Sequence, residues 1–178
     1  MLTAALVACG SGAEIPQNVN YGSARAPLQP QAFVELPLGS ISPSGWLREM
    51  LTSQRDGATG HLDELYPLVM GPRNGWLGGD GDQWERGPYW MDGLVPLAYI
   101  LQDSTLIAKA RPWIEWTLAS QQEDGYFGPV TDYGSEPGLQ RDNCRDWWPK
   151  MVMLKVLMQY HSCLLYTSPS PRDYAASR

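Results

Sequence analysis

Two patterns of apolar residues alternate along the middle of the chain, and this alternation limits the fold more than any other feature. Residues 89–101 are apolar nearly all round, which is typical of a helix buried on every side. Residues 151–158 repeat this pattern about 60 residues later. Between them, residues 104–122 carry one apolar face, which consists of Leu106, Ile107, Ala110, Ile114, Thr117 and Leu118. The sequence therefore predicts an all-α fold in which inner and outer helices form two concentric layers.

Prolines, glycines and capping residues indicate where the helices begin and end. A helix over residues 46–54 follows start signals and ends at Gly57. Residues 58–69 add a short helix that Pro67 ends or kinks. Asp103 is placed to cap the next helix. Two prolines are expected to kink the longer helices that contain them, namely Pro96 and Pro112.

Long loops precede both of the all-apolar helices. Six of the 17 residues in loop 71–87 are glycine, which prevents regular structure there. A second loop covers residues 123–148. Because each loop leads into a buried helix, we expect both loops to gather at one end of the helix layers, where binding sites are usually built.

Composition excludes some classes of partner and favours another. The 178 residues have a net charge of −6 and include only 13 Lys and Arg, which argues against nucleic-acid binding. No apolar run reaches the length of about 18 residues that a membrane-spanning helix needs. Eight Trp and nine Tyr supply flat apolar surfaces with a polar edge. This composition suits a groove that binds a ligand with both flat apolar faces and polar groups.

Aromatic and charged residues of the two loops are the candidate substrate-binding residues. They are Trp84, Glu85, Arg86 and Asp92 around the first loop, and Asp146, Trp147 and Trp148 at the end of the second. Indoles stack on the C–H faces of a sugar, while carboxylates and Arg hydrogen-bond its hydroxyls. A carboxyl partly buried beside tryptophan, Glu85 or Asp92, would have a raised pKa and act as a general acid.

Structural roles compete with these functional ones. An ordinary ion pair between Glu85 and Arg86 is as well supported as a site role. Asp82 is placed to cap a turn, and Asp146 to cap the helix that follows it. Trp90, on an all-apolar helix, is expected in the core.

The two ends of the chain are expected to lie outside the fold. Residues 1–9 resemble the end of a bacterial lipoprotein signal, in which Cys9 is lipidated, and residues 10–32 have the composition of a linker. This predicts export to the periplasm or outer membrane, with membrane contact through Cys9 alone. Residues 163–178 look like a translated sequencing adapter and are expected to be an artefact. Cys144 is then the one remaining cysteine, and we expect it to be inert, with no metal site in this chain.

Short motifs between residues 33 and 161 together resemble one enzyme family. They are Glu35-Leu-Pro-Leu-Gly-Ser-Ile41, Gly45-Trp-Leu47, Gly60-His-Leu-Asp-Glu64, Gly75-Trp-Leu-Gly-Gly79, Trp84-Glu-Arg-Gly-Pro-Tyr89, Asp92-Gly-Leu-Val-Pro-Leu97, Gln122-Glu-Asp-Gly125 and Asp146-Trp-Trp-Pro149. This set is similar to the beta-L-arabinofuranosidase-type glycoside hydrolases, family 127 and its relatives.

The resemblance implies a fold, an activity and a site. The fold is an (α/α)6 toroid, of which residues 33–162 would form an N-terminal, incomplete ring. The activity is removal of L-arabinofuranosyl residues from plant glycans, with a zinc-bound cysteine as nucleophile and a glutamate as acid/base. These catalytic groups are expected beyond His161, so the chain as written is expected to be inactive and to hold no zinc. Substrate binding is carried over to Trp84-Glu85-Arg86 and Asp146-Trp147-Trp148.

Size leads to the same expectation of an incomplete ring. Twelve helices of about 12 residues with connections of about 5 need at least about 200 residues. Residues 33–161 cannot close such a ring, so apolar helix faces should be exposed and the chain should aggregate.

Two other functions remain open from the sequence. The same tryptophans would serve a noncatalytic glycan-binding lipoprotein of the cell surface. The helical layers would also serve another toroid enzyme, such as an unsaturated-uronide hydrolase or a polysaccharide lyase. A groove for uronic acids favours basic residues, which the acidic composition does not supply.

Overall fold

The computed structural model describes residues 36–130 and 147–167, which belong to one unit, Leu36–Ser168. Within these ranges all regular structure is helical and no strand occurs. The elements are α1 (Gly45–Asp56), α2 (Ala58–Leu65), α3 (Pro67–Met70), a 3₁₀ turn η1 (Gly75–Leu77), α4 (Arg86–Leu101), α5 (Ser104–Ala119) and α6 (Trp148–Thr167). The all-α prediction is therefore confirmed. No helix of the described ranges is both long and apolar enough to cross a membrane.

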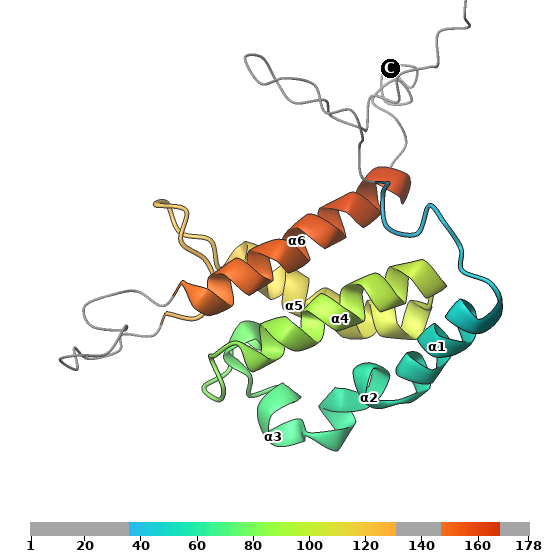
Figure 1. Cartoon of the computed structure of the whole chain (residues 1–178). Coiled ribbons are helices and arrows are strands. Elements are labelled where there is room, and N and C mark those ends of the chain that lie inside the picture. Colours follow the sequence, from blue (N-terminus) through green and yellow to red (C-terminus); the bar gives the residue numbers. More distant parts are fainter. Residues whose placement is uncertain (1–35, 131–146, 168–178) are drawn as a thin grey trace, which may run out of the picture. The chain divides into compact units, whose positions relative to one another are not determined.

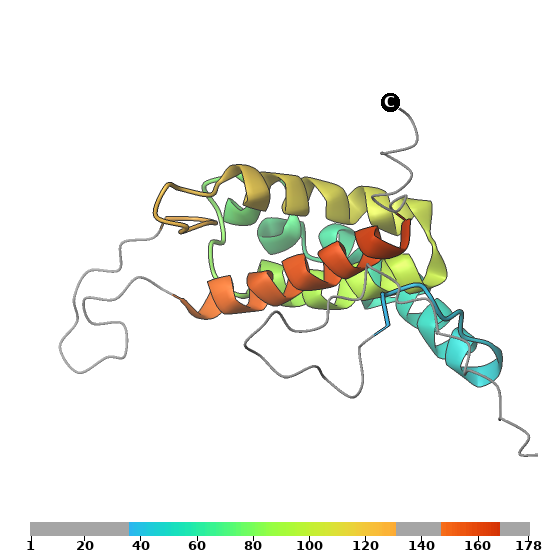
Figure 2. The ribbon, with the colours of Figure 1, turned by 90° about the horizontal axis from the view of Figure 1, so that it is seen from above.

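Helix α4 is the central element of this unit and contacts each of the other α-helices (Figure 1). The turn at Gln102 and Asp103 leads directly into α5, which therefore runs antiparallel to α4. Helix α6 runs parallel to α4, since Asp92 contacts Lys155 and, further along both helices, Tyr99 packs against Tyr160. Figure 2 shows α4, α5 and α6 side by side from a second direction.

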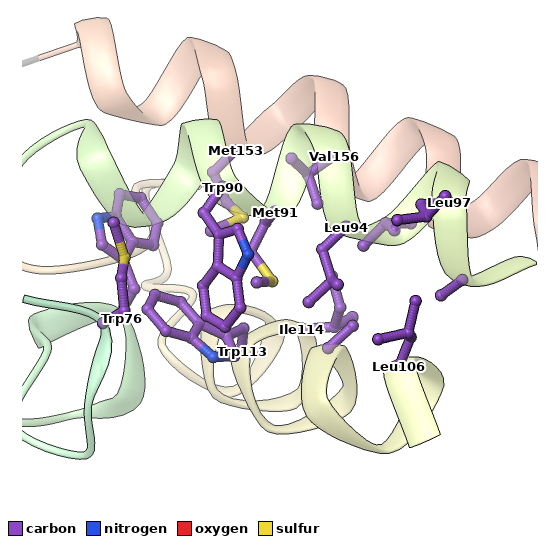
Figure 3. Close-up of a cluster of buried hydrophobic side chains, with 14 of the residues drawn as sticks. Trp76, Trp90, Met91, Leu94, Leu97, Leu106, Trp113, Ile114, Met153 and Val156 are labelled. Atoms are coloured by element: carbon purple, nitrogen blue, oxygen red, sulfur yellow. The ribbon is translucent and has the colours of Figure 1, made fainter. Parts of the chain in front are cut away.

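The core forms where α5 and α6 cover two sides of α4 (Figure 3). Its buried members include Trp90, Met91, Leu94, Val95, Leu97 and Ala98 of α4, Leu106, Ala110, Trp113 and Ile114 of α5, and Met153 and Val156 of α6. The rings of Trp90 and Trp113 meet edge to face, with their centroids 5.5 Å apart. Trp90 is thus a core residue, as expected. The predicted apolar face of α5 is also confirmed, except that Leu118 is exposed.

The helix boundaries follow the predicted signals in most places. Asp103 caps α5, because its Oδ1 accepts hydrogen bonds from the amides of Thr105 and Leu106. Pro67 opens α3 after α2 has ended at Leu65. The internal prolines do not end their helices, since α4 continues past Pro96 and α5 past Pro112.

Helix α6 differs from its prediction in length and in burial. It continues to Thr167, although residues from 163 onward are expected from the sequence to lie outside the fold. The Cys163 thiol is buried and donates a hydrogen bond to the carbonyl of Gln159. The side that faces α4 is buried at Met153 and Val156. Another side is exposed at Met151, Leu154 and Met158, since nothing in the described residues covers it. The expected exposure of apolar helix surface is therefore observed on this side of α6.

The remaining predictions for Cys9, Cys144, Asp146 and the linker 10–32 lie outside the described residues.

Candidate functional site

The two glycine-rich loops meet at one end of the helices, on the left in Figure 1. We call this region the loop end and define it as residues 71–85, 120–130 and 147–150. Lys150 joins its parts, because the buried Nζ donates to the carbonyl of Pro129 at 2.7 Å. The same Nζ lies 5.1 Å from the ring centroid of Trp76 and 5.2 Å from that of Tyr126. The expectation that both loops gather at one end is met for the parts that the structure describes.

The first loop is held in shape by hydrogen bonds around a buried Asn74. The Nδ2 of Asn74 donates to the carbonyl of Val69 at 2.7 Å, and its Oδ1 accepts from the amide of Trp76 at 2.8 Å. Backbone hydrogen bonds from Gly75 to Asp82 and from Gly79 to Asn74 close the loop. The loop is therefore preformed, which lowers the entropic cost of binding a ligand.

Trp76 is the buried indole of the loop end, with an exposure of 0%. Its Nε1 donates to the carbonyl of Trp84 at 3.0 Å and so fixes the backbone of a predicted site residue. Gly128, with φ of +83°, packs against the Trp76 ring so closely that a Cβ would approach it to 2.5 Å. Trp76 is therefore a positioning residue and does not reach a ligand.

Of the three predicted residues around the start of α4, Trp84 and Glu85 belong to the loop end and Arg86 begins the helix. Trp84 and Glu85 are half-buried and Arg86 is exposed. Arg86 donates to Oδ1 of Asp82 at 3.0 Å, so its observed ion pair is with Asp82 and not with its neighbour Glu85. Asp82 also accepts from the amide of Trp84 at 3.5 Å, which fits the capping role considered for it.

Asp92 lies about 9 Å further along α4 than Arg86. Its Oδ2 accepts from Nζ of Lys155 and its Oδ1 from Nε2 of Gln159, both at 2.8 Å. These contacts tie α4 to α6. The structure therefore places Asp92 at a helix interface rather than among the indoles of the loop end.

Trp148 begins α6 and Trp147 directly precedes it, and the two are half-exposed, at 52% and 54%. The ring of Trp147 meets that of Tyr126 edge to face, with centroids 5.6 Å apart. Tyr126 in turn donates from its hydroxyl to the carbonyl of Pro129 at 3.3 Å. Both rings belong to the second loop, and of the two only the Trp147 ring is open to solvent, because Tyr126 is buried.

A small pocket of about 300 Å³ opens between the loops. Its lining includes Trp116 of α5, Gln83 of the first loop and Gln122 of the second. The sequence did not mark Trp116 as a site residue. Trp113 and Trp116 lie three residues apart on one helix, and helical spacing alone does not reveal which indole reaches the surface.

The described residues do not fit the catalytic groups that the resemblance implies. They hold no cluster of three or more His, Cys, Asp and Glu that could bind a metal ion. Burial raises the pKa of the Cys163 thiol to about 11, so it is not ionised at neutral pH. We therefore derive no step that uses zinc or a cysteine nucleophile.

Comparisons of the chain with protein-family models, with curated proteins and with solved structures gave no match.

Proposed function

We propose that the loop end is the carbohydrate-binding face of a glycoside hydrolase-type helical domain. The residues assigned to the sugar are Trp84, Glu85, Arg86, Trp147 and Trp148, with Asp146 added from the sequence pattern. The substrate class is a plant-type glycan with L-arabinofuranosyl residues, as the motif resemblance implies. The observation that carries the proposal is the meeting of both loops at one end, with half-exposed indoles at its surface.

Half-exposed indoles suit a sugar because a sugar ring is polar at its edge and apolar on its C–H faces. Trp147 and Trp148 offer ring surface at the start of α6. Glu85 offers a half-buried carboxylate at the start of α4, and Arg86 an exposed guanidinium beside it. Stacking and directional hydrogen bonds together give a site both affinity and orientation.

We further propose that α4 and α6 are inner helices of an (α/α)6 toroid and that α5 belongs to its outer layer. The support is the direction of the helices, since α4 and α6 run parallel and α5 returns antiparallel between them in sequence. In such an arrangement the loops that precede inner helices share one rim, where a site can be assembled. The exposed side of α6 would then be covered by further helices of the ring.

Binding of an arabinan-derived oligosaccharide to the 178-residue chain tests the proposal. Isothermal titration calorimetry would compare wild type with the double variant Trp147→Ala/Trp148→Ala. We expect the double variant to bind about tenfold more weakly or worse, since each aromatic contact adds about 0.5–1.5 kcal/mol beyond the area it buries.

The matched control is Trp46→Ala. Trp46 is 70% exposed but lies at the start of α1, which Figures 1 and 2 show away from the loop end. Unchanged affinity in this variant supports a specific role for the loop end. Equal weakening in both variants, or no binding by the wild type, would overturn the proposal.

A further inference from the structure

The pocket beside Trp116 has a lining that includes none of the predicted substrate residues. We propose that it is a separate carbohydrate subsite that holds one neutral sugar ring. The inference extends the proposed function by a second binding position and rests on the pocket's own geometry.

Glycines let the backbone of the first loop pack closely against other residues that line this pocket. Gly78 has a φ of +82°, and a Cβ there would approach Nε1 of Trp116 to 2.4 Å. At Gly75 a Cβ would approach Cγ of Gln83 to 2.5 Å. The backbone of the first loop thus lies directly against the indole of Trp116. Because Asn74 and the loop's backbone hydrogen bonds hold this wall, the pocket is preformed.

The chemistry of the lining selects a neutral, hydroxyl-rich ligand. The described residues that line the pocket include no charged side chain, so a phosphate or a carboxylate would find no counter-charge. Trp116 supplies apolar indole surface for C–H groups. Gln122 is exposed, and within the described residues its side-chain amide makes no hydrogen bond, so it is available to sugar hydroxyls.

The hydroxyl of Ser120 is part of the wall and not a contact for the ligand. Its Oγ donates to the carbonyl of Thr117 at 2.6 Å and accepts from the amide of Gly128 at 2.7 Å. This pair of bonds joins the end of α5 to the second loop and fixes the far side of the pocket. A volume of about 300 Å³ is at the small end for ligand sites, which fits one ring rather than a chain of sugars.

Indole N–H signals in the NMR spectrum of the ¹⁵N-labelled chain test the inference. Tryptophan-to-phenylalanine variants assign the signals of Trp116, Trp147 and Trp148. The probe is methyl α-L-arabinofuranoside, with methyl α-D-glucopyranoside as a second neutral sugar and glucuronate as an anionic one. We expect the Trp116 signal to shift and saturate with at least one neutral sugar and not with glucuronate.

A substitution at an exposed position tests ligand binding without an expected change in the stability of the fold. Because Gln122 is exposed, Gln122→Ala should leave the spectrum otherwise unchanged and weaken the saturation of the Trp116 signal several-fold. Gln121→Ala, at the exposed neighbouring position outside the lining, is the matched control. A Trp116 signal that stays fixed with every neutral sugar, or that responds equally in both variants, would overturn the subsite. Shifts at Trp147 and Trp148 report the proposed function separately, so the two proposals fail independently.

Discussion

The tryptophans of the core differ in exposure from other tryptophans in and beside the loop end. Trp76, Trp90 and Trp113 are sealed between helices and loops, whereas Trp84, Trp116, Trp147 and Trp148 keep part of their surface open. Composition alone indicates only that the chain is rich in indoles. The same residue type therefore stabilises the core where it is buried and offers ring surface to a ligand where it is exposed.

The sharpest test of this division removes one indole from each region. Trp113→Ala should lower the free energy of unfolding by about 3–5 kcal/mol, because a buried aromatic ring leaves a cavity. Trp148→Ala should change it by less than about 1 kcal/mol, since half of its surface is already in water. Urea unfolding followed by circular dichroism measures both. Equal losses in the two variants would remove the distinction.

A pair of glycines separates the packing against Trp76 from backbone strain. Gly125 and Gly128 have φ values of +85° and +83°, but a Cβ at Gly125 meets nothing within 4 Å. Gly125→Ala should therefore cost about 1–2 kcal/mol from the left-handed backbone alone. Gly128→Ala should cost about 1–3 kcal/mol more, because the methyl group collides with the ring of Trp76. Thermal unfolding of both variants measures the difference, and equal costs would contradict the close contact.

Two lysines of α6 test how the loop end is joined to the core. Lys150 is buried, donates to Pro129 and lies near two aromatic rings, so Lys150→Ala should lower stability by about 2–3 kcal/mol. Lys155 is exposed and pairs with Asp92, so Lys155→Ala should cost less than about 1 kcal/mol. Chemical denaturation provides the values. A loss at Lys150 as small as that at Lys155 would contradict a stabilising role for the buried cation between the loops.

The smallest effect concerns a charged cluster between α2 and α5, which lies outside the loop end. Hydrogen bonds from Lys109 and His61 hold the pKa of Glu64 below its ordinary value of 4.5. The stabilisation by this carboxylate is therefore complete above that value and is lost as the pH falls through the lowered pKa. Burial lowers the pKa of Lys109, but its hydrogen bonds to Glu64 and Asp63 raise it overall above 10.5, so its own contribution is lost as the pH rises through the raised pKa.

Glu64→Gln should accordingly reduce the loss of stability in acid, while Glu123→Gln, an exposed control in the second loop, should leave it unchanged. Unfolding in urea at a series of pH values below neutrality measures the effect. An equal fall in the free energy of unfolding at low pH in wild type and Glu64→Gln would contradict this role for the ion pair.

The sequence predicted the helices better than their surroundings. The capping role of Asp103, the break at Pro67 and the burial of Trp90 all follow from local chemistry that a single segment contains. The burial of α6 does not follow from local chemistry, because apolar residues lie on every side of this helix. Only contacts with neighbouring helices determine which side is covered. One contact of its C-terminal half is also distant in sequence, since the amide of Leu38 donates a hydrogen bond to Oγ of Ser162.

The meeting of the two loops was predictable from the sequence, but the contacts of their side chains were not. Glycine-rich loops before two buried helices indicated that both loops would gather at one end of the helices. The hydrogen-bond partners of the side chains could be identified only from the structure. Arg86 bonds Asp82 instead of Glu85, and Asp92 accepts hydrogen bonds from α6. Lys150 and Trp116 carry no local pattern that distinguishes them from core residues, and both are defined by contacts across the two loops.

Oxidative footprinting of tryptophan tests the central division most directly. The folded chain would be treated with hydroxyl radicals with and without an arabinan oligosaccharide, and the oxidation of each indole read by mass spectrometry. The account predicts little oxidation of Trp76, Trp90 and Trp113 in either case, and oxidation of Trp46 whether or not the glycan is present. It also predicts that the glycan protects Trp147 and Trp148. Glycan protection that is absent there, or equal at Trp46, would contradict the assignment of the loop end to carbohydrate.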